Sequence, residues 1–252
     1  MQHWNHRFRA AGLHLVISLG IAALAAALVF GVWYPYPYRD ISGGRDLFLL
    51  LMTVDVTLGP LMTLVVFNRA KPRPELRRDL ALVGLLQLAG LVYGLWSVCL
   101  ARPVHLVFEI DRFRVVHAVD VPLKMIDKAP PDIDALPLSG PTLLSVRPFK
   151  SSQEMADATL VALQGVALGA RPDLWQSYPA AREQVLRAAK PIERLKTRFA
   201  PRAPEIDAVI SRAGRQAADT VYVPLVGRKS FWTVFIDATT AEVVAFMPLD
   251  SF

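Results

Sequence analysis

Three long apolar runs dominate the first hundred residues of the chain. They cover residues 13–33, 47–67 and 80–100, and each is long enough to cross the hydrocarbon core of a bilayer as a helix. After residue 100 the pattern changes to short alternating segments separated by turn residues. The chain is therefore predicted to be a membrane protein, with a three-helix transmembrane bundle at 13–100 followed by an extracytoplasmic domain at 101–252.

The first run also has to be weighed as a cleaved signal peptide. Arg7 and Arg9 precede it, and Ala25, Ala26 and Ala27 offer the small residues that a cleavage site needs. The run nevertheless continues to Trp33, which is too long for the apolar region of a typical signal peptide. We therefore expect an uncleaved anchor, with residues 1–12 as a short cytoplasmic flank.

Basic residues beside the runs predict the orientation of the chain. Short loops rich in Lys and Arg stay in the cytoplasm. The stretch between the second and third runs holds five such residues: Arg69, Lys71, Arg73, Arg77 and Arg78. The N-terminus is therefore predicted to be cytoplasmic, and residues 101–252 are predicted to lie on the opposite side of the membrane.

The loop between the first two runs has an unusual composition. It begins with three tyrosines, Tyr34, Tyr36 and Tyr38, separated by prolines that favour extended backbone. We expect the tyrosines to lie in the headgroup layer of the membrane. Gly43 and Gly44 are expected to form a tight turn into the second helix.

The region after residue 100 reads as an α+β domain with an antiparallel sheet. β-branched and aromatic residues mark its strands. The first predicted elements are a β-hairpin at 104–119 and an irregular proline-rich connection at 127–148. Helices are predicted at 151–168, 179–199 and 204–215, and the helix at 179–199 is expected to be interrupted near residue 191. A meander follows, with strands at 220–225, 230–236 and 242–247.

Charge and cysteine content exclude several classes of protein. The net charge is +6, yet residues 101–252 hold 19 Lys and Arg against 17 Asp and Glu, so no basic face for nucleic acid is expected. The single cysteine, Cys99, lies in an apolar run and rules out a disulfide framework within the chain. No metal-ligand spacing is present, and no cofactor is predicted.

Asp55 is the most informative residue in the apolar runs. A carboxyl group near the middle of a transmembrane helix costs at least about 2.5 kcal/mol on insertion scales, so it needs protonation, a partner or a polar cavity. Thr53, Thr57 and Gln87 are its expected neighbours. Three interpretations remain: a hydrogen bond between the second and third helices, a contact for a partner helix, or a proton site.

Glycine and proline residues in the second and third runs suggest close packing around a groove. Pro60, after Gly59, is expected to kink the second helix and open a groove for a guest helix. Gly84, Gly90 and Gly94 would let the third helix approach a neighbour closely. The predicted partner-binding residues are therefore Asp55, Thr53, Pro60 and Gln87.

No set of residues predicts catalysis, and the chain is not expected to be an enzyme. His105 and His117 fall on predicted strands, where packed or surface histidines are the simplest interpretation. Asp237 occupies a turn position, and no serine stands in a nucleophile elbow. Three helices without a repeat also argue against a transporter.

The residues of the first half are similar to a known family. The segment 34–67, YPYPYRDISGGRDLFLLLMTVDVTLGPLMTLVVF, and the later segments 101–104, ARPV, and 107–113, VFEIDRF, resemble the type IV pilin accessory proteins of the TfpX/TfpZ family. The resemblance implies a bacterial inner-membrane protein, with a periplasmic C-terminal domain, that supports a cognate pilin. It carries over no catalytic residue.

The resemblance favours a non-enzymatic accessory or chaperone protein that supports the stability or assembly of a type IV major pilin. The expected partners of this protein are that pilin and the lipid bilayer. The inner-membrane pilus assembly platform is a further candidate partner. The alternatives are a membrane-tethered periplasmic enzyme that modifies pilin or another envelope substrate, and a structural anchor for the assembly platform.

Overall fold

The computed structural model describes residues 2–68 and 70–252, so Arg69, one of the five predicted cytoplasmic cations, lies outside the described residues. The chain divides into two compact units. The helical unit comprises Met1–Tyr36 and Gly44–Ala101, and the sheet unit comprises Pro37–Gly43 and Arg102–Phe252. The chain therefore passes from one unit to the other three times.

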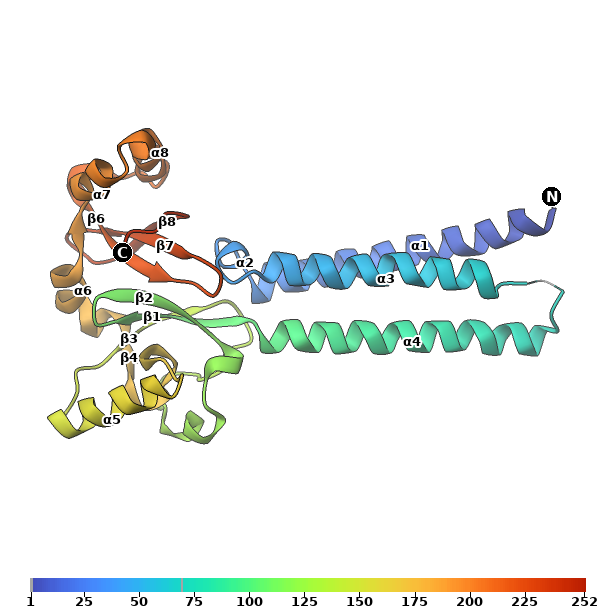
Figure 1. Ribbon diagram of the computed structural model, residues 1–252, viewed down its shortest axis with the longest axis horizontal. Coiled ribbons are helices and arrows are strands. Elements are labelled where there is room, and N and C mark those ends of the chain that lie inside the picture. Colours follow the sequence, from blue (N-terminus) through green and yellow to red (C-terminus); the bar gives the residue numbers. More distant parts are fainter. Residues whose placement is uncertain (1, 69) are drawn as a thin grey trace. The chain divides into compact units, whose positions relative to one another are not determined.

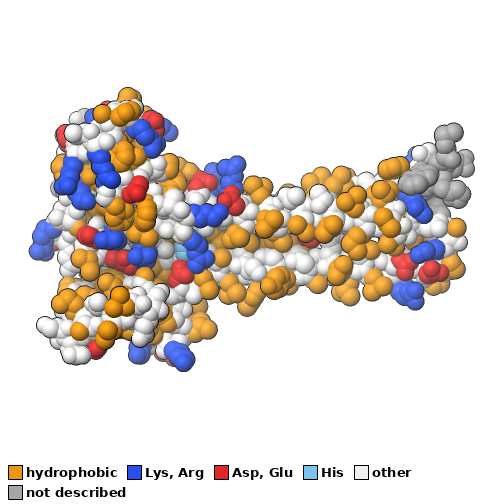
Figure 2. All heavy atoms as spheres, viewed as in Figure 1, with side chains coloured by type: hydrophobic (Ala, Val, Ile, Leu, Met, Phe, Trp, Pro, Cys, Tyr) orange, Lys and Arg blue, Asp and Glu red, His pale blue; other side chains and the backbone are white. Residues whose placement is uncertain are grey.

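The helical unit contains three long helices that lie alongside one another (Figure 1). They are α1 (Gln2–Leu28, continued by a π-helical turn at Val29–Trp33), α3 (Gly44–Val66) and α4 (Arg73–Leu100). All three are long and apolar enough to cross a membrane. Their visible surface is hydrophobic over most of its length (Figure 2), as lipid-facing helices require.

Two tyrosines of the loop between α1 and α3 have partners within the protein. Tyr34 is fully buried in the helical unit and donates a hydrogen bond from its hydroxyl to the carbonyl oxygen of Val98 at 3.1 Å. Tyr38 begins the short helix α2 (Tyr38–Ile41) and packs its ring on Phe246 of the sheet unit, with 5.8 Å between centroids. Both residues therefore pack against other parts of the protein, and their position at the depth of the headgroups remains a prediction.

Helix α2 belongs to the hydrophobic core of the sheet unit. Ile41 is fully buried there, beside residues of the central strands. Gly43 follows with a φ of +70°, which confirms the predicted turn, and a Cβ at this position would meet the side chain of Lys229 at 2.6 Å. A segment of only seven residues between two apolar helices thus completes the core of the other unit.

The sheet has eight strands, and neighbouring strands follow the order β4-β3-β1-β2-β6-β7-β8, with β5 paired to β6 outside this path. The strands are β1 (Pro103–Glu109), β2 (Arg112–His117), β3 (Thr142–Val146), β4 (Trp175–Ser177), β5 (Lys190–Pro191), β6 (Thr220–Val226), β7 (Phe231–Asp237) and β8 (Val243–Met247). The predicted hairpin is β1–β2 and the predicted meander is β6–β7–β8. Most pairs are antiparallel, whereas β1–β3 and β2–β6 are parallel.

The segment 127–148 was wrongly predicted to be irregular throughout. Its residues Thr142–Val146 form β3, which lies parallel to β1 and joins the hairpin to β4. Pro141 and Pro148 flank this strand and do not interrupt it. A short strand bounded by prolines is hard to distinguish from a loop by its sequence pattern.

Four further helices cover the sheet besides α2: α5 (Ser152–Leu163), α6 (Arg182–Ala188), α7 (Ile192–Arg198) and α8 (Ala203–Arg212). The predicted interruption near Pro191 is present, because Lys190–Pro191 pairs with β6 between α6 and α7. Ser151 caps α5 by accepting a hydrogen bond from the backbone N–H of Glu154 at 3.1 Å.

Successive side chains along each strand point to opposite faces of the sheet, so the hydrophobic core lies on both faces. One face packs against α2 and α6 through residues including Phe108, Val115, Val185, Leu225 and Val234. The opposite face is covered by α5 beside β1 and β3, and by α7 and α8 beside β6, β7 and β8. Both faces of the sheet are therefore buried within the sheet unit, and α2 is required on one of them.

Replacing Ile41 by alanine tests whether α2 stabilises the sheet unit. Removing a fully buried isoleucine costs about 2–5 kcal/mol in unfolding free energy. We expect Ile41→Ala to lower the thermal unfolding temperature of the detergent-solubilised protein. The exposed neighbour Arg39, changed to alanine, should have little effect, and equal effects of the two variants would contradict this assignment.

Candidate functional site

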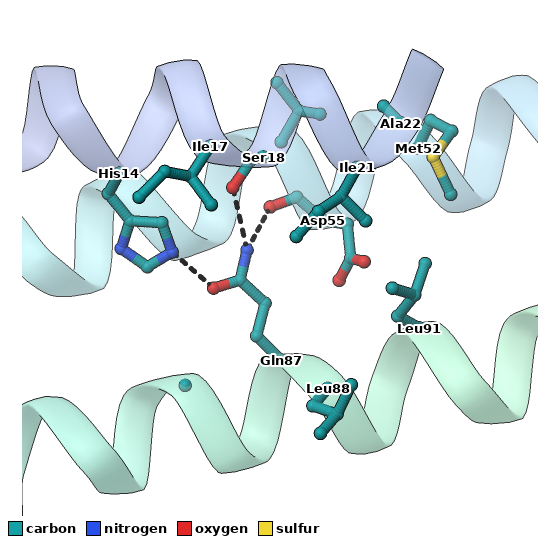
Figure 3. Close-up of a pocket in the computed structure, with 12 residues that line it drawn as sticks. His14, Ile17, Ser18, Ile21, Ala22, Met52, Asp55, Gln87, Leu88 and Leu91 are labelled. Carbon is teal, nitrogen blue, oxygen red and sulfur yellow. Dashed lines mark hydrogen bonds between the residues drawn. The ribbon is translucent and has the colours of Figure 1, made fainter. Parts of the chain in front are cut away.

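The candidate site is a cleft of 190 Å³ inside the helical unit. Helix α1 packs along α3 and α3 packs along α4, whereas α1 and α4 have few direct backbone contacts. The cleft lies between these two outer helices, with residues of α3 between them (Figure 3). Its lining residues are His14, Ile17, Ser18, Ile21, Ala22, Met52, Asp55, Val56, Gly84, Gln87, Leu88 and Leu91.

Gln87 connects the three helices through one side-chain amide. Its Nε2 donates to Ser18 Oγ of α1 at 3.2 Å and to the backbone oxygen of Asp55 on α3 at 3.0 Å. Its Oε1 lies 2.6 Å from His14 Nε2 of α1. Because an amide oxygen can only accept, His14 Nε2 is the donor, and in the neutral ring Nδ1 accepts from the Thr63 hydroxyl at 2.5 Å.

Asp55 contributes its backbone oxygen to this network, but its carboxyl group does not join it. The side chain points into the cleft toward α4 (Figure 3). It forms no hydrogen bond or ion pair with any residue in the described parts of the chain. The predicted hydrogen bond between the second and third helices therefore exists, but Gln87 and the Asp55 backbone make it.

Glycines set how closely α3 and α4 approach each other. A Cβ on Gly59 would meet the Gln87 amide at 2.2 Å, and one on Gly94 would meet the Leu51 side chain at 2.0 Å. At Gly90 the nearest atom is Asp55 Oδ1, at 3.8 Å, and at Gly84 nothing lies within 4 Å. The close approach predicted for the third helix is thus made at Gly94, while Gly84 faces open space in the cleft.

The other two predicted site residues lie outside the cleft. Thr53 is exposed on α3, and its backbone oxygen accepts a hydrogen bond from the Thr57 hydroxyl at 2.6 Å, so neither threonine is a neighbour of the Asp55 carboxyl group. Pro60 is half-buried inside α3, which continues through it as one helix. Of the four predicted residues, the structure brings together Asp55 and Gln87.

Sequence reasoning missed His14, Ser18 and Thr63. A usable signal was present, because His14 and Ser18 are four residues apart and therefore lie on the same face of an apolar helix. Ser18 and Thr63 are almost fully buried, although most side chains on these helices are exposed. Polar residues facing inward in an apolar helix indicate an inter-helix network.

The histidines of the sheet unit have structural surroundings. His105 is fully buried, with Nδ1 2.5 Å from Thr142 Oγ1 and Nε2 3.1 Å from the backbone oxygen of Ala135. Burial away from water lowers the pKa of His105 to about 4, so this ring is neutral near pH 7. Asp237 accepts hydrogen bonds from the backbone N–H groups of Thr239 and Thr240, which confirms its role in a turn.

The sheet unit also contains a more polar cavity of 490 Å³. It is lined in part by His117, whose Nδ1 lies 3.0 Å from Asp120, and by Arg228, which pairs with Asp120 at 2.9 Å. No serine, threonine, cysteine or lysine is among its lining residues, all of which are described. A histidine oriented by a carboxylate is present here without a hydroxyl, thiol or lysine side chain for it to activate.

The fold and the cleft define a membrane-anchored protein, in which three apolar helices enclose a hydrogen-bonded polar network and carry an α+β domain. A family model described as Fimbrial assembly protein FimB matches residues 2–43. No solved structure matches the chain.

Relatives extend the match over nearly the whole chain. The fimbrial assembly protein of serogroup I from Dichelobacter nodosus is 35% identical over 245 residues, which are 94% of this chain and 95% of the relative. The serogroup E1 protein of the same organism is 33% identical with the same coverage, and the protein of serogroups C1 and C2 is 40% identical over 48% of this chain and 92% of its own length. This chain therefore belongs to the family of fimbrial assembly proteins.

Alanine at Gly59 tests the Gln87 network. The new Cβ would push the Gln87 amide away from its partners, at a cost of about 1–2 kcal/mol for the lost hydrogen bonds. Gly84→Ala is the matched control, because its Cβ meets no atom within 4 Å and alanine favours a helix. We expect only Gly59→Ala to lower the unfolding temperature in detergent, and a loss of similar size in Gly84→Ala would contradict the assignment.

Proposed function

We propose that this chain is a non-enzymatic accessory protein of the bacterial inner membrane that supports the stability or assembly of a type IV major pilin. The observation that carries the proposal is the 35% identity to a protein named for fimbrial assembly, over 95% of that relative. The narrower resemblance to TfpX/TfpZ accessory proteins agrees with it and remains a prediction.

The packing of α2 supports the proposed topology. Residues Pro37–Gly43 lie in the same compact unit as Arg102–Phe252. If all three helices span the membrane, the loop between α1 and α3 and the C-terminal domain are on one side, and the loop between α3 and α4 is on the other. Lys71 of that second loop pairs with Asp79 at 2.6 Å, and Arg73, Arg77 and Arg78 follow at the start of α4. The basic loop therefore favours a cytoplasmic position.

Reporter fusions test this orientation. Alkaline phosphatase joined after residue 252 is expected to be active, because this enzyme needs the periplasm to form its disulfides. The same reporter joined after residue 79, which keeps the basic residues of this stretch, is expected to be inactive. Activity of the second fusion without the first would reverse the topology and remove the periplasmic role.

A scaffold that holds a partner fits the structure better than an enzyme does. The cleft of the helical unit is lined mainly by aliphatic side chains, and the polar cavity of the sheet unit has no serine, threonine, cysteine or lysine among its lining residues. No group of three His, Cys, Asp or Glu side chains within the described chain is arranged to hold a metal ion. The proposed activity is therefore binding, through the membrane helices, the α+β domain or both.

Deletion of the gene in its native host tests the proposal directly. We expect lower pilin levels in the membrane and fewer surface pili, while cleavage of the pilin precursor proceeds normally. Tagged protein solubilised from membranes should co-purify with pilin. Normal piliation in the deletion strain would refute the proposed function, and crosslinks to the assembly platform without pilin would instead favour a structural anchor.

A further inference from the structure

We propose that a single membrane-spanning helix of a partner protein docks across the cleft between α1 and α4, and that this helix presents a hydrogen-bond donor to Asp55. The inference deepens the proposed function and rests on it only for naming pilin as that partner. The donor is an N–H, ammonium or hydroxyl group at the depth of Asp55. The cleft, its chemistry and the exposed glycine beside it each support this occupant.

The cleft of 190 Å³ can admit side chains of an additional helix that packs across α1 and α4. Gln87 bridges to α1 through His14 and Ser18, while the apolar residues beside this bridge do not close over it. Ile17 of α1 is 53% exposed and Leu88 of α4 is 57% exposed, although both line the cleft. These side chains form two apolar walls without a protein neighbour between them.

Gly84 provides a point of close backbone approach on the α4 wall. No atom lies within 4 Å of the position that its Cβ would occupy. Small residues at this kind of position let two transmembrane helices pack with their backbones close together. The other glycines of α4 differ, because Gly94 is covered by Leu51 and Gly90 lies beside Asp55.

The Asp55 carboxyl group determines the chemistry of the occupant. It points into the cleft and has no partner in the described chain (Figure 3). A lipid acyl chain would fill the same volume but offers no donor, so the carboxyl group would remain unpaired in an apolar environment. A helix with a donor satisfies Asp55 and covers the apolar walls at the same time.

Water is a poorer occupant for this cleft than a helix. An ordered water needs two to four polar partners. The amide of Gln87 is already engaged at both ends, and the Ser18 hydroxyl accepts from it. Asp55 therefore offers the main unengaged polar group on walls formed mostly by apolar residues.

Site-specific photocrosslinking in intact cells tests the proposal. A benzophenone amino acid replaces Leu88 in the cleft or, as the matched control, Leu86, which is 62% exposed on α4 but does not line the cleft. After irradiation, the full-length protein is purified and the crosslinked peptide is identified by mass spectrometry. The expected adduct at position 88 is a peptide from an apolar span with a donor side chain, in higher yield than at position 86.

Variants at two positions establish what holds the helix. Asp55→Leu removes the acceptor and should lower the adduct yield about 3- to 30-fold, the range expected for losing one hydrogen bond within a membrane. Asp55→Asn keeps an acceptor oxygen and should retain more of the yield. Gly84→Leu places a bulky side chain in the open part of the cleft and should also reduce the yield. Unfolding temperatures in detergent show that each variant is folded.

The outcomes separate this inference from the proposed function. An Asp55-dependent adduct with the pilin span supports both, whereas one with a span of another membrane protein supports helix docking and contradicts pilin as the partner. Adducts with lipid alone, with a second copy of this chain, or with yields unchanged in folded Asp55→Leu overturn the docking inference. Those results leave the deletion phenotype, and thus the proposed function, unaffected.

Discussion

The helical unit depends on one half-buried amide, that of Gln87. Lipid tails are as apolar as leucine, so the hydrophobic effect does not hold membrane helices together, and close packing and polar contacts must do so. Gln87 supplies such contacts to α1 and α3 from α4, and Gly59 leaves the space that its side chain fills. This bridge fixes the axial register of all three helices and defines one end of the neighbouring cleft.

Much of the fold could be predicted from the sequence, because its main signals are local. The three spans follow from the length and composition of single apolar runs, and the β1–β2 hairpin and C-terminal meander follow from short-range alternation. Two elements escaped this reasoning. Strand β3 is bounded by prolines that suggest a loop, and α2 gains its stability from partners more than sixty residues away, such as Val115 and Phe246.

The candidate site was only partly predictable, because its residues meet across helices that are far apart in the sequence. Asp55 and Gln87 stand out because strongly polar side chains are rare within an apolar span. Thr53 was expected near Asp55, yet two residues along a helix correspond to a rotation of about 200°, which places it on a different face. His14 and Thr63 meet across helices, and the register that brings them together depends on packing that no single segment specifies.

The composite core of the sheet unit links folding to membrane insertion. Its hydrophobic interior is assembled from Pro37–Gly43 and from Arg102–Phe252, two parts of the chain separated by two apolar helices. A chain in which only one helix of the α3–α4 pair crossed the membrane would leave these two parts on opposite sides, and Ile41 could not reach the sheet. One face of that sheet would then stay exposed to proteases and to aggregation, so only correctly threaded molecules would mature and persist.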